Sequence, residues 1–268
     1  MTKRRHELTD EQWAKLVVLL PPEKPRTGRP SLAHRQIVNG ILWVLRTGAP
    51  WRDMPERYGK WKTVYSRFRR WRETGVWDRM LAAVQEKADQ RGEIAWEAHY
   101  VDGQCGSGAS TRRRSQKGGE QALGRSRGGF STKIHVRAEG QGKPMTFVLT
   151  GGERHEVTAL PQLLDQGAVK RIGPGRPRRR PKRVVGDKGY SYRSVRRFLR
   201  QRGIRSTIPR RSNQPHGGPF DREIYRQRNR VERLFNRLKQ YRRIATRYDK
   251  LATSYHAMLT LAAIMLWI

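Results

Sequence analysis

"STKIHVRAEGQGKPMTFVLTGG", residues 131–152, decides the fold class, because polar and apolar residues alternate in both of its halves. That alternation is typical of half-buried antiparallel strands. Further short strands are predicted on either side of this pair. The segment "EAHYVDG" (97–103) contains a strand that ends at Asp102. The segment "PKRVVGDKGY" (181–190) contains one that ends at Asp187, and "IRSTIP" (204–209) is a third. Helical patterns cover 156–166, 192–202, 225–248 and 252–268, so we expect an α/β fold with a mixed sheet flanked by helices.

The chain is predicted to divide near residue 95, into an all-α region (1–95) and the α/β region (96–268). Thr9 and Gln12 form a plausible capping box for a first helix, and apolar residues recur at helical spacing in a second one until Gly48. A short turn and a basic helix then follow, which is the layout of helix-turn-helix DNA-binding domains. The basic residues that we assign to DNA there are Lys60, Lys62, Arg67 and Arg70. The alternative is a helical domain with a solvated basic face.

Charge indicates the partner. The 268 residues include 58 Lys and Arg against 23 Asp and Glu, which gives a formal net charge of +35. Such an excess works against compaction unless a polyanion neutralises it, and nucleic acids are the abundant polyanions in cells. A membrane surface is a weaker alternative, since Arg recurs along the whole chain instead of gathering in a tail. The single cysteine, Cys105, excludes an internal disulfide and fits a reducing compartment, so we expect a cytoplasmic protein.

Three carboxylates stand out against this basic background. Asp102 and Asp187 each follow a short apolar strand, and Glu232 lies among many Arg and Lys in a helix-like run. Taken alone, each has an ordinary interpretation, either a turn residue or a helix-surface ion pair with Arg228. Taken together, they are what Mg²⁺ ions require, because hard cations need oxygen ligands. Two metal ions are suited to phosphodiester cleavage, and the surrounding basic residues would hold the DNA backbone.

A family resemblance makes the pattern specific. Tyr225, Arg228, Glu232 and Lys239 fit the pattern Y-x2-R-x3-E-x6-K, which resembles the signature of DDE transposases encoded by bacterial insertion sequences. Further blocks resemble the same group, in particular the fifth of the numbered insertion-sequence families. They are "LTDEQWAKLVVLLPP", "GRSRGGFSTKIHV", "VVGDKGY", "RNRVERLFNRLKQYRRIATRYDKL" and the long block over 28–80. The resemblance covers nearly the whole chain.

The resemblance implies an RNase H-like catalytic core in which Asp102, Asp187 and Glu232 are the catalytic, metal-binding triad. It also implies Mg²⁺ or Mn²⁺, two ions per site, and double-stranded DNA as partner, both as terminal inverted repeats and as target. Water would attack at the transposon end to release a 3′-OH, which would then attack target DNA. Since two ends must be joined, we expect a homodimer or a larger complex on DNA, associated with a prokaryotic nucleoid. The remaining DNA contacts that we predict are Tyr225, Arg228 and Lys239, with Arg125, Arg127, Lys133 and Lys188.

Two other functions stay open at this point: a metal-dependent nuclease of the same fold, and a DNA-binding repressor without activity. A catalytic role for His155 or Glu156 is not expected, because metal ions replace an imidazole base and Glu156 stands where many relatives have aspartate. Asp165 is the main rival for a place in the triad, but it falls late in a helix-like run instead of at a strand end.

Overall fold

The computed structural model describes residues 6–23, 32–108, 121–126, 129–171, 173–214 and 220–268. Its longer helices are α1 (Asp10–Val17), α2 (His34–Thr47), α3 (Trp61–Glu73), α4 (Val76–Gln90), α6 (Arg193–Gln201), α8 (Asn229–Lys239) and α10 (Ala252–Trp267). The shorter ones are α5 (Leu160–Asp165), α7 (Arg222–Arg226) and α9 (Arg242–Ala245), with 3-10 turns η1 (Trp51–Asp53), η2 (Glu56–Tyr58), η3 (Glu156–Ala159) and η4 (Lys188–Tyr190). The strands are β1 (His99–Gly108), β2 (Gly124–Ser126), β3 (Gly129–Ala138), β4 (Pro144–Gly151), β5 (Arg183–Val185), β6 (Arg205–Thr207) and β7 (Thr246–Arg247).

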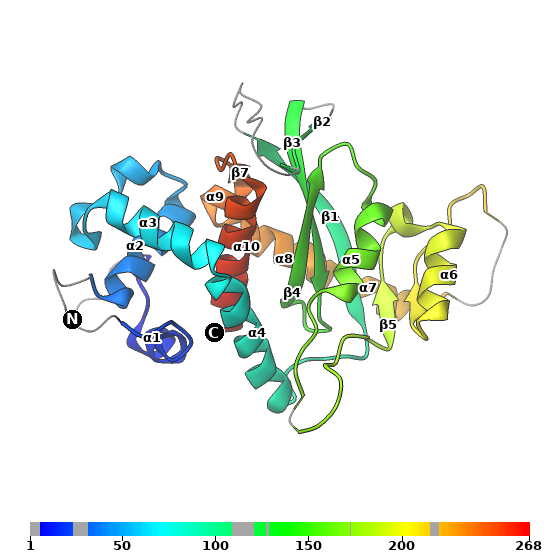
Figure 1. Ribbon diagram of the computed structural model, residues 1–268. Coiled ribbons are helices and arrows are strands. Elements are labelled where there is room, and N and C mark those ends of the chain that lie inside the picture. Colours follow the sequence, from blue (N-terminus) through cyan, green and yellow to red (C-terminus); the bar gives the residue numbers. More distant parts are fainter. Residues whose placement is uncertain (1–5, 24–31, 109–120, 127–128, 172, 215–219) are drawn as a thin grey trace.

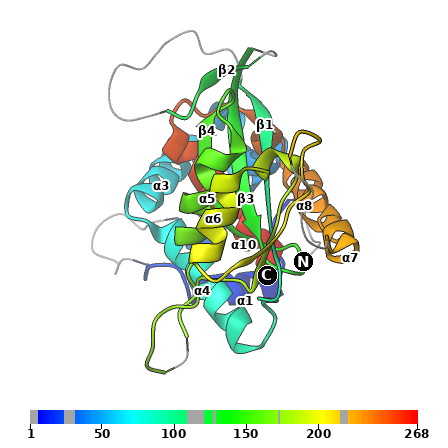
Figure 2. The ribbon, with the colours of Figure 1, turned by 90° about the vertical axis from the view of Figure 1, so that its right-hand side faces the viewer.

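One mixed sheet forms the centre of the molecule. Its main strands run in the order β4-β3-β1-β5-β6, where β1, β3 and β4 are antiparallel neighbours and β5 and β6 run parallel to β1. The short strands β2 and β7 pair with β3 and β1. In Figure 1 the helices α4 and α10 lie on one side of the sheet and α5 and α6 on the other. Figure 2 shows α7 and α8 along one edge of the same sheet. This arrangement confirms the predicted α/β fold with a mixed sheet flanked by helices.

The helical region begins as predicted. Thr9 caps α1 in a capping box with Gln12, and α2 ends where Gly48 takes the left-handed conformation (φ 72°). The predicted short turn before the basic helix is wrong, because residues 48–60 separate α2 from α3, whereas a helix-turn-helix has a turn of three or four residues. The η1 and η2 turns fill this longer connection, and Met54 and Tyr58 from it are buried in the core.

The core extends across both regions of the chain. α10 is apolar all round and buried on nearly all sides, as expected of a helix inside a protein. It packs against α3 and α4 from the helical region and against β4 from the sheet. Phe68 and Trp71 of α3 contribute to this core, so the aromatic face of the basic helix is packing surface. No helix in the described ranges is long and apolar enough to cross a membrane.

Two predicted element boundaries are wrong. β1 does not end at Asp102 but continues to Gly108, because its long antiparallel pairing with β3 holds it in the sheet. The run 225–248 is not one helix but α7, α8, α9 and β7. Between α7 and α8 the amides of Arg228 and Val231 bond to carbonyls three residues back, a tightened turn that starts α8 afresh. Pro161 is compatible with α5 because it lies in the first turn of that helix.

Candidate active site

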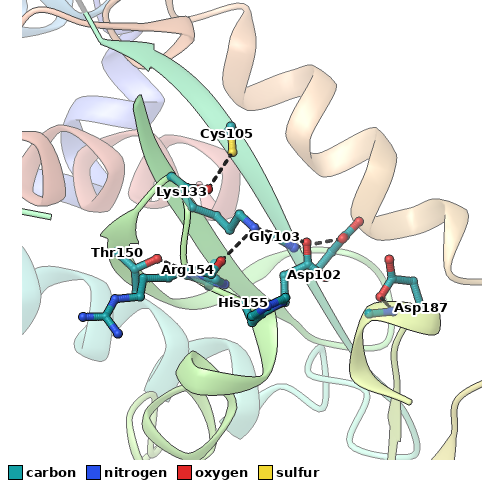
Figure 3. A network of polar contacts seen from close by, with 12 residues as sticks. Asp102, Gly103, Cys105, Lys133, Thr150, Arg154, His155 and Asp187 are labelled. Carbon is teal, nitrogen blue, oxygen red and sulfur yellow. Dashed lines mark hydrogen bonds and ion pairs between the residues drawn. The ribbon is translucent and has the colours of Figure 1, made fainter. Parts of the chain in front are cut away.

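The sheet brings Asp102 and Asp187 together. β1 and β5 run parallel with Tyr100 opposite Val185, and continuing this register by two residues sets Asp102 beside Asp187. Asp102 accepts a hydrogen bond from the amide of Gly103 (2.8 Å). Asp187 directly follows β5 and caps η4 by accepting one from the amide of Gly189 (2.8 Å). Figure 3 shows both side chains on these neighbouring segments.

Glu232 reaches the same site from α8. Residues 231, 234, 235 and 238 form a buried apolar face of this helix, and α8 packs against β1. Since the apolar face is fixed against the sheet, the position next to Val231 falls at the border of the exposed face. The side chain of Glu232 is 49% exposed there.

Arg228 connects two of the three acids. Its Nη1 donates to Oδ2 of Asp102 (3.1 Å), and its Nη2 donates to Oε1 of Glu232. The first contact joins residues 126 positions apart in sequence, so the pair with Glu232 is not merely an ion pair along one helix. The guanidinium also lies 5.9 Å from the ring centre of Tyr225, so three of the four signature residues meet here. Lys239 is exposed at the end of α8, two helical turns from Glu232.

The negative charge of Asp102 is poorly compensated. Burial raises the pKa of Asp102 to about 6, and the negative charges of Asp187 and Glu232 act in the same direction. The Arg228 guanidinium and the Gly103 amide lower that pKa without overcoming the burial. Asp187 and Glu232 thus both act electrostatically on Asp102. Perturbation of this kind by burial and like charges is common at functional sites.

A fourth carboxylate, Glu156, belongs to the same cluster. A Cβ built on Gly103 would lie 2.9 Å from its Cγ, and one built on Gly189 would lie 2.3 Å from its Oε2. Glu156 therefore lies between the backbones that carry Asp102 and Asp187. Burial and then the charge of Asp187 raise its pKa. Its only signal in the sequence is its place after His155 in the segment 151–157, and we did not expect it in the site.

The predicted DNA contacts divide into two groups. Lys133 is 15% exposed and donates to the carbonyl of Arg154 (2.9 Å), 3.8 Å from Glu156, so it serves the acid cluster. Arg67 contacts Nδ1 of His34 (3.1 Å) and covers the ring of Trp71, which makes it a packing residue. The exposed positions, open to a partner, are Lys60, Lys62, Arg70, Arg125, Lys188 and Lys239. Arg127 lies outside the described residues.

The rejected candidates lie elsewhere or face solvent. His155 is exposed, at the start of η3. Asp165 makes an ion pair with Arg202 (2.7 Å), and hydrogen bonding to that guanidinium lowers its pKa. Neither observation places them among the metal-binding candidates.

Two family models match this chain. The model described as "Transposase DDE domain" matches residues 100–267, and the one described as "Putative transposase of IS4/5 family" matches residues 8–81. The first alone covers more than half of the sequence. The chain therefore belongs to the family of transposases with a DDE domain, and its N-terminal part is similar to the IS4/5 family model.

Individual relatives agree with this assignment. A 16.2 kDa protein of the insertion element IS402 from Burkholderia cepacia is 42% identical over 92 residues, which is 31% of this chain and 63% of that protein. A "Putative transposase for insertion sequence element IS402" from the same organism is 34% identical over 116 residues, 43% of this chain and 53% of that protein. The chain thus spans less than two thirds of these curated relatives. A Mos1 strand transfer complex is similar with a TM-score of 0.28 and 9% identity over 81% of each chain.

Membership of this family implies dependence on a divalent metal ion, and the chemistry of the acid cluster fits one. Its ligands are carboxylates, the donors that hard cations prefer. Burial first, and then like-charge repulsion, raise the pKa of Asp102 and Glu156, and added positive charge would offset both effects. Across the described ranges, no three Asp, Glu, His or Cys side chains are already spaced to hold a metal. In this structure Arg228 contacts two of the acids, Asp102 and Glu232.

Proposed function

We propose that this protein is a DNA transposase of an insertion sequence. It binds the terminal inverted repeats, cleaves DNA at the transposon ends by hydrolysis, and joins the resulting 3′-OH to target DNA. The observation that supports this most is the convergence of Asp102, Asp187 and Glu232 from three separate elements, with Arg228 in contact with two of them. A DNA-binding repressor would gain nothing from such acids at a basic surface.

Asp102, Asp187 and Glu232 are the residues that would hold Mg²⁺ or Mn²⁺, two ions per site. When bound, these ions would activate the attacking oxygen and stabilise the leaving oxygen of the phosphodiester. The protein's own task is positioning. The Arg228 guanidinium, bound to carboxylates in this structure, is within reach of a phosphate at the same place, and Lys188 offers a second positive charge directly after Asp187.

In the first step, a water oxygen attacks the phosphorus at the transposon end, and the bond to the 3′ oxygen breaks to leave a 3′-OH. In the second step, that hydroxyl attacks a target phosphodiester, so that one bond forms as one breaks and no energy source is needed. We assign the steps to residues 96–268 and DNA recognition to residues 1–95, with Lys60, Lys62 and Arg70 exposed for it. Because two ends must be joined, the active form is a dimer or larger.

The test uses the purified full chain with Mg²⁺ or Mn²⁺ and a labelled duplex that carries the element's terminal repeat. We expect nicking at the repeat end and joining of that end to a plasmid. Asp102→Asn and Asp187→Asn should abolish both reactions and leave binding to the duplex intact. Nicking without joining would instead identify a nuclease, and binding without either reaction would identify a repressor.

A further inference from the structure

A large basic cleft lies next to the acid cluster, between α6, β6 and the segment after β6. Its volume is about 930 Å³. Among its lining residues in the described part of the chain, six are basic and none is acidic: Lys188, Arg196, Arg200, Arg205, Arg210 and Arg211. A concave surface with one sign of charge concentrates the field and attracts ions of the opposite sign. The cleft is therefore built for an anion.

The arginines of this cleft have different tasks. Arg196 donates to the carbonyl of Ile208 (2.9 Å), and Arg211 donates to the hydroxyl of Tyr192 (3.1 Å), so both fix the wall of the cleft. Arg200 and Arg205, by contrast, are exposed. The cleft thus combines a rigid wall with charges that face solvent, which suits a ligand that lies along it.

The cleft is continuous with the acid cluster at two points. Arg211 donates from Nε to the carbonyl of Lys188 (3.3 Å), the residue after Asp187. At the other point Phe220, 40% exposed, lies 5.3 Å from the ring of Tyr225, which in turn contacts Arg228. A DNA strand in the cleft would therefore lead to the acids.

The position of the cleft indicates which DNA it holds. In Figure 1 the helices α1 to α3, to which we assign the transposon end, lie on the opposite side of the sheet from α6. A strand that reaches the acids from those helices would leave them on the α6 side. After cleavage, the DNA on that side would then be the target. Arginine and lysine without acidic neighbours are typical of contacts to phosphates, which position DNA without reading its sequence.

We infer that the cleft between α6 and β6 binds the phosphodiester backbone of target DNA during strand transfer. This inference rests on the proposed transposase function and adds to it the surface that receives the target. The partner is duplex DNA of any sequence, because the lining offers charge to phosphates.

Two double variants of the full chain test this inference. Arg200→Gln with Arg205→Gln removes two exposed charges from the cleft. Arg193→Gln with Arg197→Gln removes two exposed charges from α6 that do not line the cleft, and so has the same net charge. Binding of a mixed-sequence duplex without the terminal repeat is measured over a salt series, and joining of a pre-cleaved repeat end to a plasmid is measured beside nicking of the uncleaved end.

We expect the slope of log affinity against log salt to become shallower by about 1.8 in the cleft variant, since two lost contacts count about 0.9 each. Joining should fall about tenfold or more, while nicking and melting temperature stay as in the control variant. An unchanged slope in the cleft variant, or an equal loss of joining in the cleft variant and the control variant, would overturn the inference. Equal loss of nicking and joining would also overturn it, because the cleft would then hold the transposon end.

Failure of the proposed function itself has a different signature. The unmodified protein would then bind DNA but would neither nick nor join in either metal. A shallower slope in the cleft variant would still support the cleft as a duplex-binding surface, whereas an unchanged slope would overturn both statements.

Discussion

Two clusters of charged side chains in this protein are built in opposite ways. Arg243 and Asp249 are 5% and 8% exposed and form a two-pronged pair, with Nε–Oδ2 and Nη2–Oδ1 distances of 3.1 and 3.0 Å. Arg243 also donates to the carbonyl of Ala49 (3.2 Å) and lies over the ring of Trp51. In this pair each charge has its own opposite charge.

The acid cluster has no such balance. It contains four carboxylates, Asp102, Asp187, Glu156 and Glu232, while the ion pairs found for them in the described residues involve only Arg228 and Lys133. We interpret the balanced pair as structural and the unbalanced acids as candidates for a functional site. A balanced pair stabilises the fold, whereas a surplus of one sign is unfavourable until a ligand of the other sign arrives.

The largest effect should come from breaking the balanced pair. Arg243→Ala leaves Asp249 buried without its partner, and we expect the free energy of unfolding to fall by about 3–5 kcal/mol. Chemical denaturation measures this loss. As a control, the double variant Arg243→Leu with Asp249→Leu removes both charges and should regain most of it. A loss below about 1 kcal/mol for Arg243→Ala would mean that the pair is not the structural element described here.

Asp102→Asn should do the opposite and stabilise the metal-free protein. The ordinary pKa of an aspartate is 3.8, and in the folded protein burial raises the pKa of Asp102 to about 6. Between these values the folded state holds a proton that the unfolded state has lost, so stability falls as pH rises and the cost is complete above pH 6. The variant avoids this cost, which amounts to at most about 3 kcal/mol.

Denaturation of both proteins between pH 4 and pH 7.5 should show the two curves separating as pH rises. Asp165→Asn is the matched control, because its partner Arg202 lowers the pKa of Asp165, and at 49% exposure it should lose less than about 1 kcal/mol at neutral pH. If Asp102→Asn, like the control, lowered the free energy of unfolding at neutral pH, the charge of Asp102 would be compensated in the folded protein and the acid cluster would have no surplus of negative charge.

Glu156→Gln tests whether the fourth acid belongs to the surplus. We expect the affinity for Mn²⁺ to weaken about 10- to 100-fold, as for groups that support metal ligands. Calorimetric titration of the metal measures this without DNA or turnover. Glu153→Gln, three residues earlier and beside Arg154, is the control and should leave the affinity unchanged. If Glu156→Gln also left it unchanged, Glu156 would only fill the space between Gly103 and Gly189.

Sequence patterns predicted much of this structure because they act locally. The alternation of polar and apolar residues predicted the strands of the sheet, and the capping box predicted the start of α1. Because the chain has few acids, Asp102, Asp187 and Glu232 could be selected as candidate ligands. Even the end of β1 was mistaken, however, because the pairing with β3 that extends the strand to Gly108 is not a local property.

What could not be predicted depends on contacts between distant residues. Lys133 is a basic residue of the kind that contacts DNA, but in the folded protein its amine contacts the carbonyl of Arg154 and lies near Glu156. Arg228 pairs with Glu232 four residues away, as any helix might show, and only the packing of α8 on β1 adds Asp102. Glu156 enters the cluster because two glycines leave room for its carboxylate, and spacing in the sequence does not express that.

The smallest effect on stability, and the sharpest on activity, is expected for Glu232→Gln. The pair with Arg228 has the spacing of a helix-surface ion pair and Glu232 is 49% exposed, so its loss should change the free energy of unfolding by less than about 0.5 kcal/mol. Affinity for the repeat duplex should also remain. Nicking and joining should nevertheless disappear, because the amide is a poor ligand for a hard cation. A variant that still joined ends would show that the lone acid of α8 is an ordinary ion pair and that the metal-binding triad is wrongly assigned.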